Sequence, residues 1–293
     1  MKTNLSLTYI TLFPDLIAGY LQDALLKKAI DQNVFKYEII NLRNYSDNNY
    51  KSVDEKVYGD NDGMILRPDI ADKVFTDLNK KNSVKSLNIY MSPQGKKLNQ
   101  ELLNELASYD HINILCGRYG GVDHRIIDQY IDVEISIGDY ILSGGELAAL
   151  VLTESLSRLV KGVVGNAESV VEDSLSKGLL ESPQFTKPQV YQGSHGELKV
   201  PSVLLSGHHE RINLWKNITS VMVTYFKRKD LLDLYIKDHM TKKMDHDLIS
   251  QFKKIIKYSP DFETDLLEIF ESDEILEFQR FLKQMIQNLE QGS

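Results

Sequence analysis

Short apolar segments alternate with helical patterns from residue 5 to residue 160, and this alternation restricts the fold more than any other feature. Residues 5–12 are rich in β-forming types and end at Phe13-Pro14, after which the apolar residues of 15–30 recur at helical spacing. Further strands are predicted at 37–42, 87–91, 112–116 and 133–137, and further helices at 70–78, 98–107, 125–130 and 145–160. Strands that alternate with helices predict an α/β domain with a mainly parallel sheet, in which ligands bind beyond the carboxyl ends of the strands.

The pattern changes after residue 160. Many Gly, Ser and Pro residues and little periodicity over 161–197 indicate an interdomain linker, and a helical pattern resumes at Val200. We therefore predict four parts, which are an α/β domain over 1–162, a linker over 163–198, a small helical domain over 199–257, and an acidic, amphipathic helical tail over 258–293. The polar residues 43–63, rich in Asn, Asp and Tyr, indicate a long functional loop.

Charge is distributed unevenly along the chain. The formal net charge of −8 by itself argues against a polyanionic partner. However, the tail 258–293 is strongly acidic, whereas 206–257 is basic and includes Lys227-Arg228-Lys229. A basic stretch of this kind fits a solvated helical surface as well as a nucleic-acid-binding surface, so charge alone leaves both open. The complementary charges also suggest that the tail folds back over the basic stretch.

Cysteine and histidine content argues against a metal centre. The single cysteine, Cys116, cannot form an intramolecular disulfide or a multi-thiolate zinc site, and it fits a reducing cytoplasm. His208-His209 and Asp245-His246-Asp247 lack the spacing that places ligands on one helical face, so we predict no metal ligands. The N-terminal apolar segment is too short to span a membrane and has no signal-type cleavage pattern, so we expect a cytoplasmic protein without membrane association.

Four loops at predicted strand ends combine small residues with exposed main chain, at 92–95, 116–123, 136–146 and 172–174. Glycines there would let a ligand approach main-chain N–H and C=O groups, which can bind an adenine edge or a ribose. Each loop taken singly is also compatible with an ordinary tight turn. The sequence has neither a Gly-x-Gly-x-x-Gly motif after its first strand nor a phosphate-binding Gly-x-x-x-x-Gly-Lys-Ser/Thr motif, which excludes two common kinds of nucleotide site.

In combination and order, these segments resemble the bacterial tRNA (guanine-N1)-methyltransferases of the TrmD family, in the SPOUT superfamily. The resemblance covers about the first 215 residues and extends more loosely to about 257. The matching segments are Thr11-Leu12-Phe13-Pro14, Ser92-Pro93-Gln94-Gly95-Lys96, Cys116-Gly117-Arg118-Tyr119, the run from Ile135 to Leu147, Ser157-Arg158, Glu172-Asp173-Ser174, Gly178-Leu179-Leu180-Glu181 and Val203-Leu204-Leu205-Ser206-Gly207.

The resemblance implies a SPOUT-type parallel sheet with a deep trefoil knot, which no periodicity argument would predict. It also implies an obligate homodimer whose active sites are each completed by the second chain, with S-adenosylmethionine bound in a bent form inside the knot. The family uses magnesium, although the sequence has no dedicated cage of ligands for it. The residues that the resemblance assigns to the cofactor are Tyr90, Met91, Ser92, Pro93, Gly95, Gly117, Tyr119, Ser136, Ile137, Gly138, Tyr140, Leu142, Gly144 and Gly145.

The implied reaction needs a base. Guanine N1 carries a proton near neutral pH, so methyl transfer to it needs a general base close to the donor. Asp173 matches the family's catalytic aspartate, and Arg158 would stabilise the negative charge that develops on guanine O6. Ser169, Tyr58 and Gly63 match positions expected to contact the substrate. Outside the family context, Asp173 would be an ordinary helix N-cap and Arg158 a solvated helix residue.

The chain departs from the family in a few places. Asp60, Asn61 and Asp62 replace two glycines and a proline in a loop expected near tRNA, and Gly120 replaces a glutamate close to the methyl donor. The leading prediction is methylation of guanine N1 at position 37 of tRNA, beside the anticodon. Two alternatives stay open, a related RNA methyltransferase with an altered substrate and a non-catalytic RNA-binding paralogue that keeps the knot.

Overall fold

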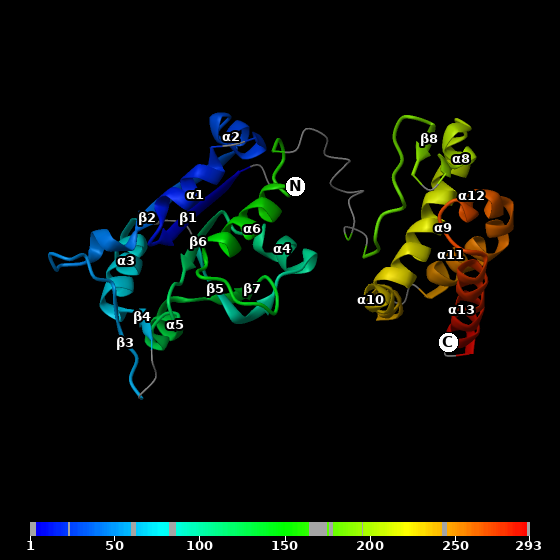
Figure 1. Ribbon diagram of the computed structural model, residues 1–293. Coiled ribbons are helices and arrows are strands. Elements are labelled where there is room, and N and C mark those ends of the chain that lie inside the picture. Colours follow the sequence, from blue (N-terminus) through cyan, green and yellow to red (C-terminus); the bar gives the residue numbers. More distant parts are fainter. Residues whose placement is uncertain are drawn as a thin grey trace. The chain divides into compact units, whose positions relative to one another are not determined.

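The computed structural model of the chain describes residues 4–22, 24–59, 63–81, 86–163, 175, 178–194, 196–241 and 245–291. The chain falls into two compact units, Met1–Val170 and Val171–Ser293 (Figure 1). Each unit has its own hydrophobic core.

A five-stranded sheet forms the centre of the first unit, with the strand order β2-β1-β6-β5-β7. All of its neighbouring strands pair in parallel, which confirms the parallel α/β fold predicted from the sequence. The strands are β1 (Leu5–Thr11), β2 (Phe35–Asn41), β5 (Ser86–Lys97), β6 (His111–Cys116) and β7 (Val133–Ser136).

Helices cover both faces of this sheet (Figure 1). Alternate residues of β1 point to opposite faces, so Leu7 and Tyr9 join one core while Ile10 joins the other. The first core is covered by α1 (Pro14–Leu21), α2 (Ala24–Asp31), α4 (Gln100–Leu106) and α6 (Glu146–Ser157), and the second by α3 (Pro68–Lys81) and α5 (His124–Tyr130). The single helix predicted over 15–30 is therefore two helices, α1 and α2.

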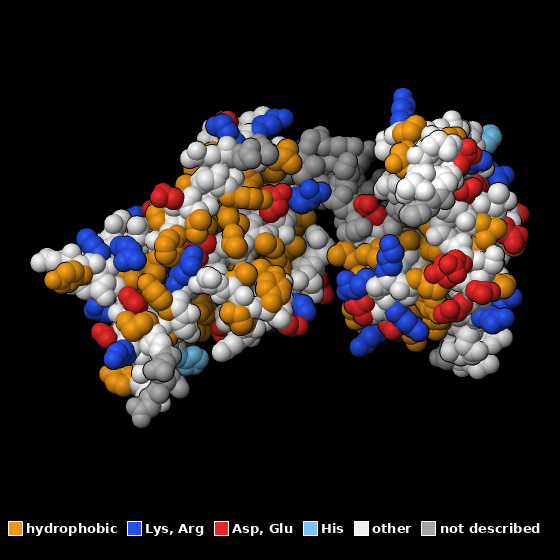
Figure 2. Space-filling model, in the orientation of Figure 1, with side chains coloured by type: hydrophobic (Ala, Val, Ile, Leu, Met, Phe, Trp, Pro, Cys, Tyr) orange, Lys and Arg blue, Asp and Glu red, His pale blue; other side chains and the backbone are white. Residues whose placement is uncertain are grey.

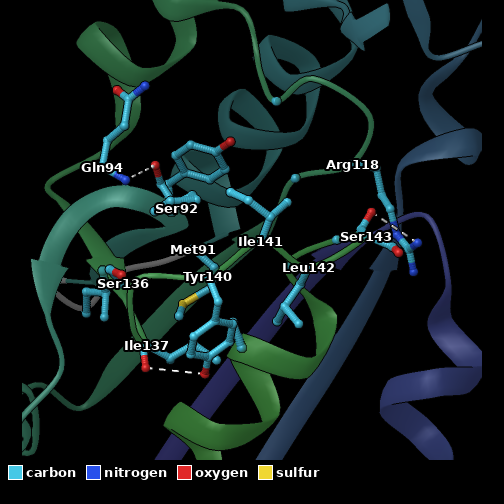
Figure 3. Close-up of a pocket in the computed structure, with 18 of the residues that line it drawn as sticks. Met91, Ser92, Gln94, Arg118, Ser136, Ile137, Tyr140, Ile141, Leu142 and Ser143 are labelled. Atoms are coloured by element: carbon cyan, nitrogen blue, oxygen red, sulfur yellow. Dashed lines mark hydrogen bonds between the residues drawn. The ribbon is translucent and has the colours of Figure 1, made fainter. Parts of the chain in front are cut away.

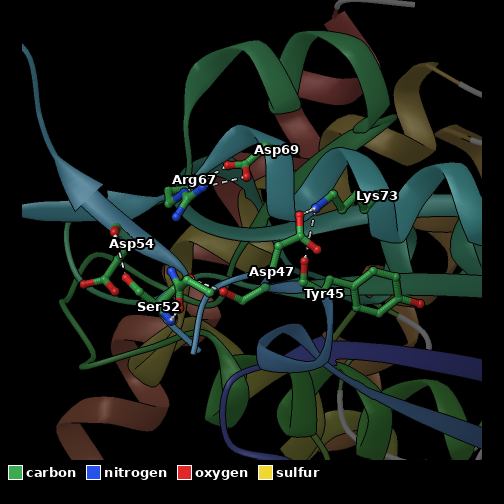
Figure 4. A network of polar contacts seen from close by, with 9 residues as sticks. Tyr45, Asp47, Ser52, Asp54, Arg67, Asp69 and Lys73 are labelled. Atoms are coloured by element: carbon green, nitrogen blue, oxygen red, sulfur yellow. Dashed lines mark hydrogen bonds and ion pairs between the residues drawn. The ribbon is translucent and has the colours of Figure 1, made fainter. Parts of the chain in front are cut away.

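The long polar loop is held against α3. It contains a short 3-10 helix, η1 (Leu42–Tyr45), and a hairpin of β3 (Asp54–Lys56) and β4 (Met64–Leu66). Lys73 of α3 donates to the carboxylate of Asp47, and this hydrogen bond holds the pKa of Asp47 below its ordinary value. Figure 4 shows these two side chains pointing toward one another, with Ser52 of the same loop nearby. The loop is thus ordered both by polar contacts and by the burial of Leu42 and Val53 in the second core.

The second unit is mainly helical. Its helices are α8 (Ser202–Leu205), α9 (His209–Lys227), α10 (Lys229–Thr241), α11 (Asp245–Tyr258), η2 (Ser259–Phe262), α12 (Glu263–Leu267) and α13 (Ser272–Gln291). A hairpin of β8 (Val190–Gly193) and β9 (Gly196–Lys199) precedes them, inside the stretch predicted to be a linker without regular structure. The hairpin residues are mostly exposed. Because neither face of the hairpin is buried, its sequence does not show the alternation of apolar and polar residues that identifies a half-buried strand.

The C-terminal helices belong to the core of the second unit. Phe278, Leu282 and Leu289 of α13 are buried in the same cluster as Trp215 of α9 and Phe252 of α11. The predicted amphipathic pattern is therefore present, but its apolar side completes a core rather than forming an appendage.

Polar contacts also join the C-terminal segment to the rest of the second unit. Glu290 forms an ion pair with Lys253 of the basic stretch at 2.6 Å. The carboxylate of Asp265 lies 2.5 Å from the main-chain nitrogen of Ser202 and 2.9 Å from its hydroxyl, both of which donate to it at the start of α8. These contacts join α13 to α11 and α12 to α8.

Replacement of Phe278 tests this role. Phe278→Ala is expected to destabilise the second unit by about 3–5 kcal/mol, because the ring is fully buried and its removal leaves a cavity. Urea unfolding followed by fluorescence of Trp215, the only tryptophan, measures this core directly. The control Leu276→Ala removes a side chain that is 50% exposed on the same helix and should cost less than about 1 kcal/mol. Equal effects of the two variants would contradict the packing described above.

Candidate functional site

Three loops at the carboxyl edge of the sheet enclose a cavity of about 430 Å³. The first loop interrupts β5, and the other two follow β6 and β7. These three strands are adjacent, so parallel pairing brings the loops to one edge. Figure 3 shows side chains of all three loops around the cavity. Every residue that the sequence assigns to the cofactor lines this cavity, with the exception of Gly95.

The first loop is an excursion within β5. Met91 and Lys96 both pair with Ile135 of β7, so the residues between them are extruded from the sheet. The hydroxyl of Ser92 accepts a hydrogen bond from the main-chain nitrogen of Gln94 at 3.2 Å and tightens the turn (Figure 3). A Cβ at Gly95 would lie 2.3 Å from the carbonyl carbon of Glu134, so only glycine fits there. Gly95 does not line the cavity, but its lack of a side chain lets the first loop lie against β7 and so determines the position of the lining residues.

The second and third loops touch through their main chains. The nitrogen of Gly145 donates to the carbonyl oxygen of Gly117 at 2.9 Å, and a Cβ at Gly145 would lie 2.9 Å from Cα of Cys116. In the third loop, Gly138 has a φ of +147°, which only glycine adopts readily, and the Tyr140 ring packs against it. Because these main chains lie so close together, backbone atoms form this part of the cavity wall.

The cavity is electrically almost neutral. Arg118 is the only charged residue among the described residues that line it. Tyr90 lies in its wall, and burial raises the pKa of this phenol to about 12, so the group stays protonated. Exposed apolar and aromatic side chains, Tyr119, Tyr140 and Ile141, surround the opening. Main-chain polar groups with apolar and aromatic neighbours suit a planar heterocycle such as adenine.

The hairpin of β3 and β4 contacts the cavity's second loop. The nitrogen of Gly120 donates to the carbonyl oxygen of Met64 at 2.8 Å. Tyr58 and Gly63 lie in the connection between β3 and β4, where Tyr58 is 95% exposed and Gly63 has a φ of +141°. The two predicted substrate residues, Tyr58 and Gly63, thus belong to a hairpin that contacts the second loop of the cavity. The loop residues 60–62 lie outside the described residues.

Of the two predicted catalytic residues, the structure describes Arg158 but not Asp173. Arg158 is the half-buried C-cap of α6, and its nitrogen donates to the carbonyl oxygen of Glu154 at 3.3 Å. It does not line the cavity within the first unit. Asp173 and Ser169 lie outside the described residues, so the structure does not test their placement.

The described residues meet the requirements of neither a metal site nor a membrane-spanning helix. Within the described ranges, no group of three or more His, Cys, Asp or Glu side chains is arranged to hold a metal ion. None of the helices in the described part of the chain is long and apolar enough to cross a membrane.

Comparison with known proteins identifies one family. A family model described as tRNA (Guanine-1)-methyltransferase TrmD matches residues 5–234. A tRNA (guanine-N(1)-)-methyltransferase of Bacillus subtilis is 39% identical over 250 residues, which is 85% of this chain and all of that protein. Proteins of the same name from Staphylococcus carnosus and from Buchnera aphidicola are 39% and 43% identical over 86% and 85% of this chain, and the matches cover 99% and 91% of those proteins.

Gly95→Ala tests the shape of the first loop. The added methyl group would overlap the main chain of β7, so the pairing of β5 with β7 beside the first loop should be disrupted. The strain should cost about 1–3 kcal/mol, which lowers the melting temperature by several degrees. Hydrogen exchange of residues 92–97 should also accelerate. Gly193→Ala is the control, because a Cβ there meets only ordinary contacts at 3.4–3.5 Å. Unchanged exchange in the first variant would contradict the tight approach.

Proposed function

The chain belongs to the tRNA (guanine-1)-methyltransferase family, and from this premise we propose that it methylates N1 of guanine at position 37 of tRNA with S-adenosylmethionine as the methyl donor. One observation carries the proposal. The residues that the family resemblance assigns to the cofactor come from three separate loops, yet they surround a single cavity. The position of the modified guanine and the identity of the donor are the steps that go beyond family membership.

The cavity fits the proposed donor. Main chain forms its wall at Gly138, Gly144 and Gly145, because side chains there would occupy the space that neighbouring groups fill. An adenosine can therefore bond to backbone N–H and C=O groups at the carboxyl ends of β5, β6 and β7. When bound, S-adenosylmethionine supplies an activated methyl group on its sulfonium.

The chain's own residues would supply the proton transfer. Asp173 accepts the N1 proton of guanine, Arg158 stabilises the negative charge on O6, and Ser169 helps to hold the base. Arg158 lies at the end of α6 opposite the pocket and does not line it, so this assignment rests on the family resemblance. The position of the hairpin beside the pocket supports contacts of Tyr58 and Gly63 with tRNA.

We further infer that the last part of the first unit forms a deep trefoil knot. The approach of the third loop to the second, through the hydrogen bond between Gly145 and Gly117, supports this arrangement. The proposed division has a catalytic domain over 1–162, a linker over 163–198, a helical tRNA-binding domain over 199–257 and a C-terminal segment over 258–293. The basic residues of 206–257 support the tRNA-binding role.

A homodimer with shared active sites is also part of the proposal. Exposed apolar side chains lie on the adjacent helices α1 and α6 and at the turn before α1; these are Phe13, Leu16, Tyr20, Leu147 and Val151. Figure 2 shows hydrophobic side chains gathered over these helices on the face that it displays. Apolar patches of this kind commonly mark subunit interfaces.

The family implies two further expectations. A tRNA substrate would place the reaction in the cytoplasm. Magnesium is used by the family, but because the described residues offer no cluster of metal ligands we assign it no residues and no step.

A methylation assay tests the proposed function. The purified full-length protein is incubated with labelled S-adenosylmethionine and with matched tRNA transcripts that carry guanine or adenine at position 37. We expect 1-methylguanosine on the guanine transcript alone. Absence of product, with binding of S-adenosylmethionine demonstrated in parallel, would refute the proposed substrate, and absence of both would refute the proposed cofactor.

Asp173→Ala is expected to abolish methyl transfer, because no other group in the proposal accepts the N1 proton. Binding of S-adenosylmethionine should change less than about twofold, since the proposal gives Asp173 a role in proton transfer and none in holding the donor. Single-turnover kinetics and titration calorimetry measure the two effects. A collapse of cofactor affinity would show that the assigned role is wrong.

Gly120→Glu restores the family's glutamate and should raise the rate constant for methyl transfer, because a side chain that helps to position the base beside the donor favours the reactive geometry. The backbone of Gly120 does not adopt a positive φ, so a side chain is permitted. Its Cβ would lie 3.2 Å from the carbonyl oxygen of Met64, which requires a small displacement of β4. Gly120→Gln is the matched control for size. An unchanged or lower rate in the glutamate variant would contradict the prediction.

A further inference from the structure

A buried carboxylate, Glu146, lies beside the pocket and has no part in the chemistry proposed above. It is the first residue of α6, and its side chain is only 1% exposed. Burial of a carboxylate is strongly destabilising unless a cation and hydrogen bonds replace its lost hydration. The residues around Glu146 provide both.

The contacts of Glu146 form a closed ring of four residues. The hydroxyl of Thr11 donates to Oε1 at 2.8 Å, and Nε of Arg118 donates to Oε2 at 3.0 Å. The main-chain nitrogen of Phe13 donates to the hydroxyl of Thr11 at 2.9 Å. The ring closes because the guanidinium carbon of Arg118 lies 4.2 Å from the centre of the Phe13 ring. Glu146 thereby joins the end of β1 to the second loop of the pocket.

The third loop is attached to the same ring of contacts. A terminal nitrogen of Arg118 donates to the carbonyl oxygen of Ser143 at 3.3 Å, as Figure 3 shows. A Cβ at Gly144 would lie 2.2 Å from Nε of Arg118 and 2.6 Å from Oε2 of Glu146. The ion pair therefore occupies a space that exists because residue 144 is glycine.

We propose that Glu146 is a positioning residue for the donor pocket, which holds Arg118 in one orientation and so fixes the second and third loops before S-adenosylmethionine binds. An arginine side chain has many rotamers, and ordering it together with two loops upon binding would weaken affinity. Because Glu146 already holds Arg118 in place in the folded protein, the entropic cost of ordering this side chain and the two loops does not reduce the affinity for the donor. The inference rests on the proposed function for the identity of the ligand.

Glu146→Gln in the full-length protein tests the proposal. Glutamine keeps the size of the side chain and can accept the hydrogen bond from Thr11, but it carries no charge to hold Arg118. We expect the Kd and the KM for S-adenosylmethionine to rise about tenfold, with the KM for tRNA unchanged within about twofold. A purely structural role would reduce the amount of folded enzyme, and so the apparent kcat, without changing the KM. An unchanged KM and Kd for S-adenosylmethionine would overturn the proposal.

Asp139→Asn is the matched control. Asp139 is a carboxylate on the same third loop and pairs with Lys97 at 3.2 Å, but its side chain is 88% exposed. Its replacement should change the KM for S-adenosylmethionine less than about twofold, because exposed ion pairs contribute little. An equal effect of both replacements would overturn the special role of Glu146.

Thr11→Val keeps the proposal testable if Glu146→Gln does not fold. Valine preserves the shape of a strand residue and removes only the hydroxyl, which donates to Glu146 and accepts from the main-chain nitrogen of Phe13. The KM for S-adenosylmethionine should rise about threefold; no rise would overturn the proposal. Failure of the unaltered protein to bind S-adenosylmethionine would instead refute the proposed cofactor, so the two failures are distinguishable.

Discussion

Direct contact between main chains, with no side chain between them, is the constraint on which the pocket depends. Gly95 lies against the backbone of β7, and Gly145 lies against the backbone that follows β6. A side chain at either position would separate the loops that form the wall. Peptide groups therefore form part of the wall, beside apolar and aromatic side chains such as Met91 and Leu142. Recognition by the main-chain part of such a wall depends on backbone geometry.

The arrangement of the two cores explains why this edge carries the site. Helices cover both faces of the parallel sheet, as shown by the division of β1 residues between one core containing Leu7 and another containing Ile10. A ligand cannot reach a covered face, so access is left at the ends of strands. The adjacent positions of β5, β6 and β7 then bring three loops together from distant parts of the chain.

Much of the first unit was predictable, because its strands are apolar and its helices have regular spacing. The glycines of the three loops also identified the pocket, through their family resemblance. The double pairing of Ile135 with Met91 and Lys96 was not predictable, since it depends on the register of two strands. The hairpin β8–β9 was missed because its exposed residues show no alternation. The partners of Glu146 come from segments far apart in sequence, so their contact appears only in three dimensions.

The packing of α13 has a consequence for the order in which the two units fold during synthesis. Among the described residues, the core of the first unit ends at Val163, whereas that of the second includes Leu289. A ribosome encloses the last residues of a nascent chain, so the first unit can fold while translation continues. The second must wait until its final helix emerges. Until then, the surfaces of α9 and α11 that α13 later covers remain exposed to chaperones and proteases.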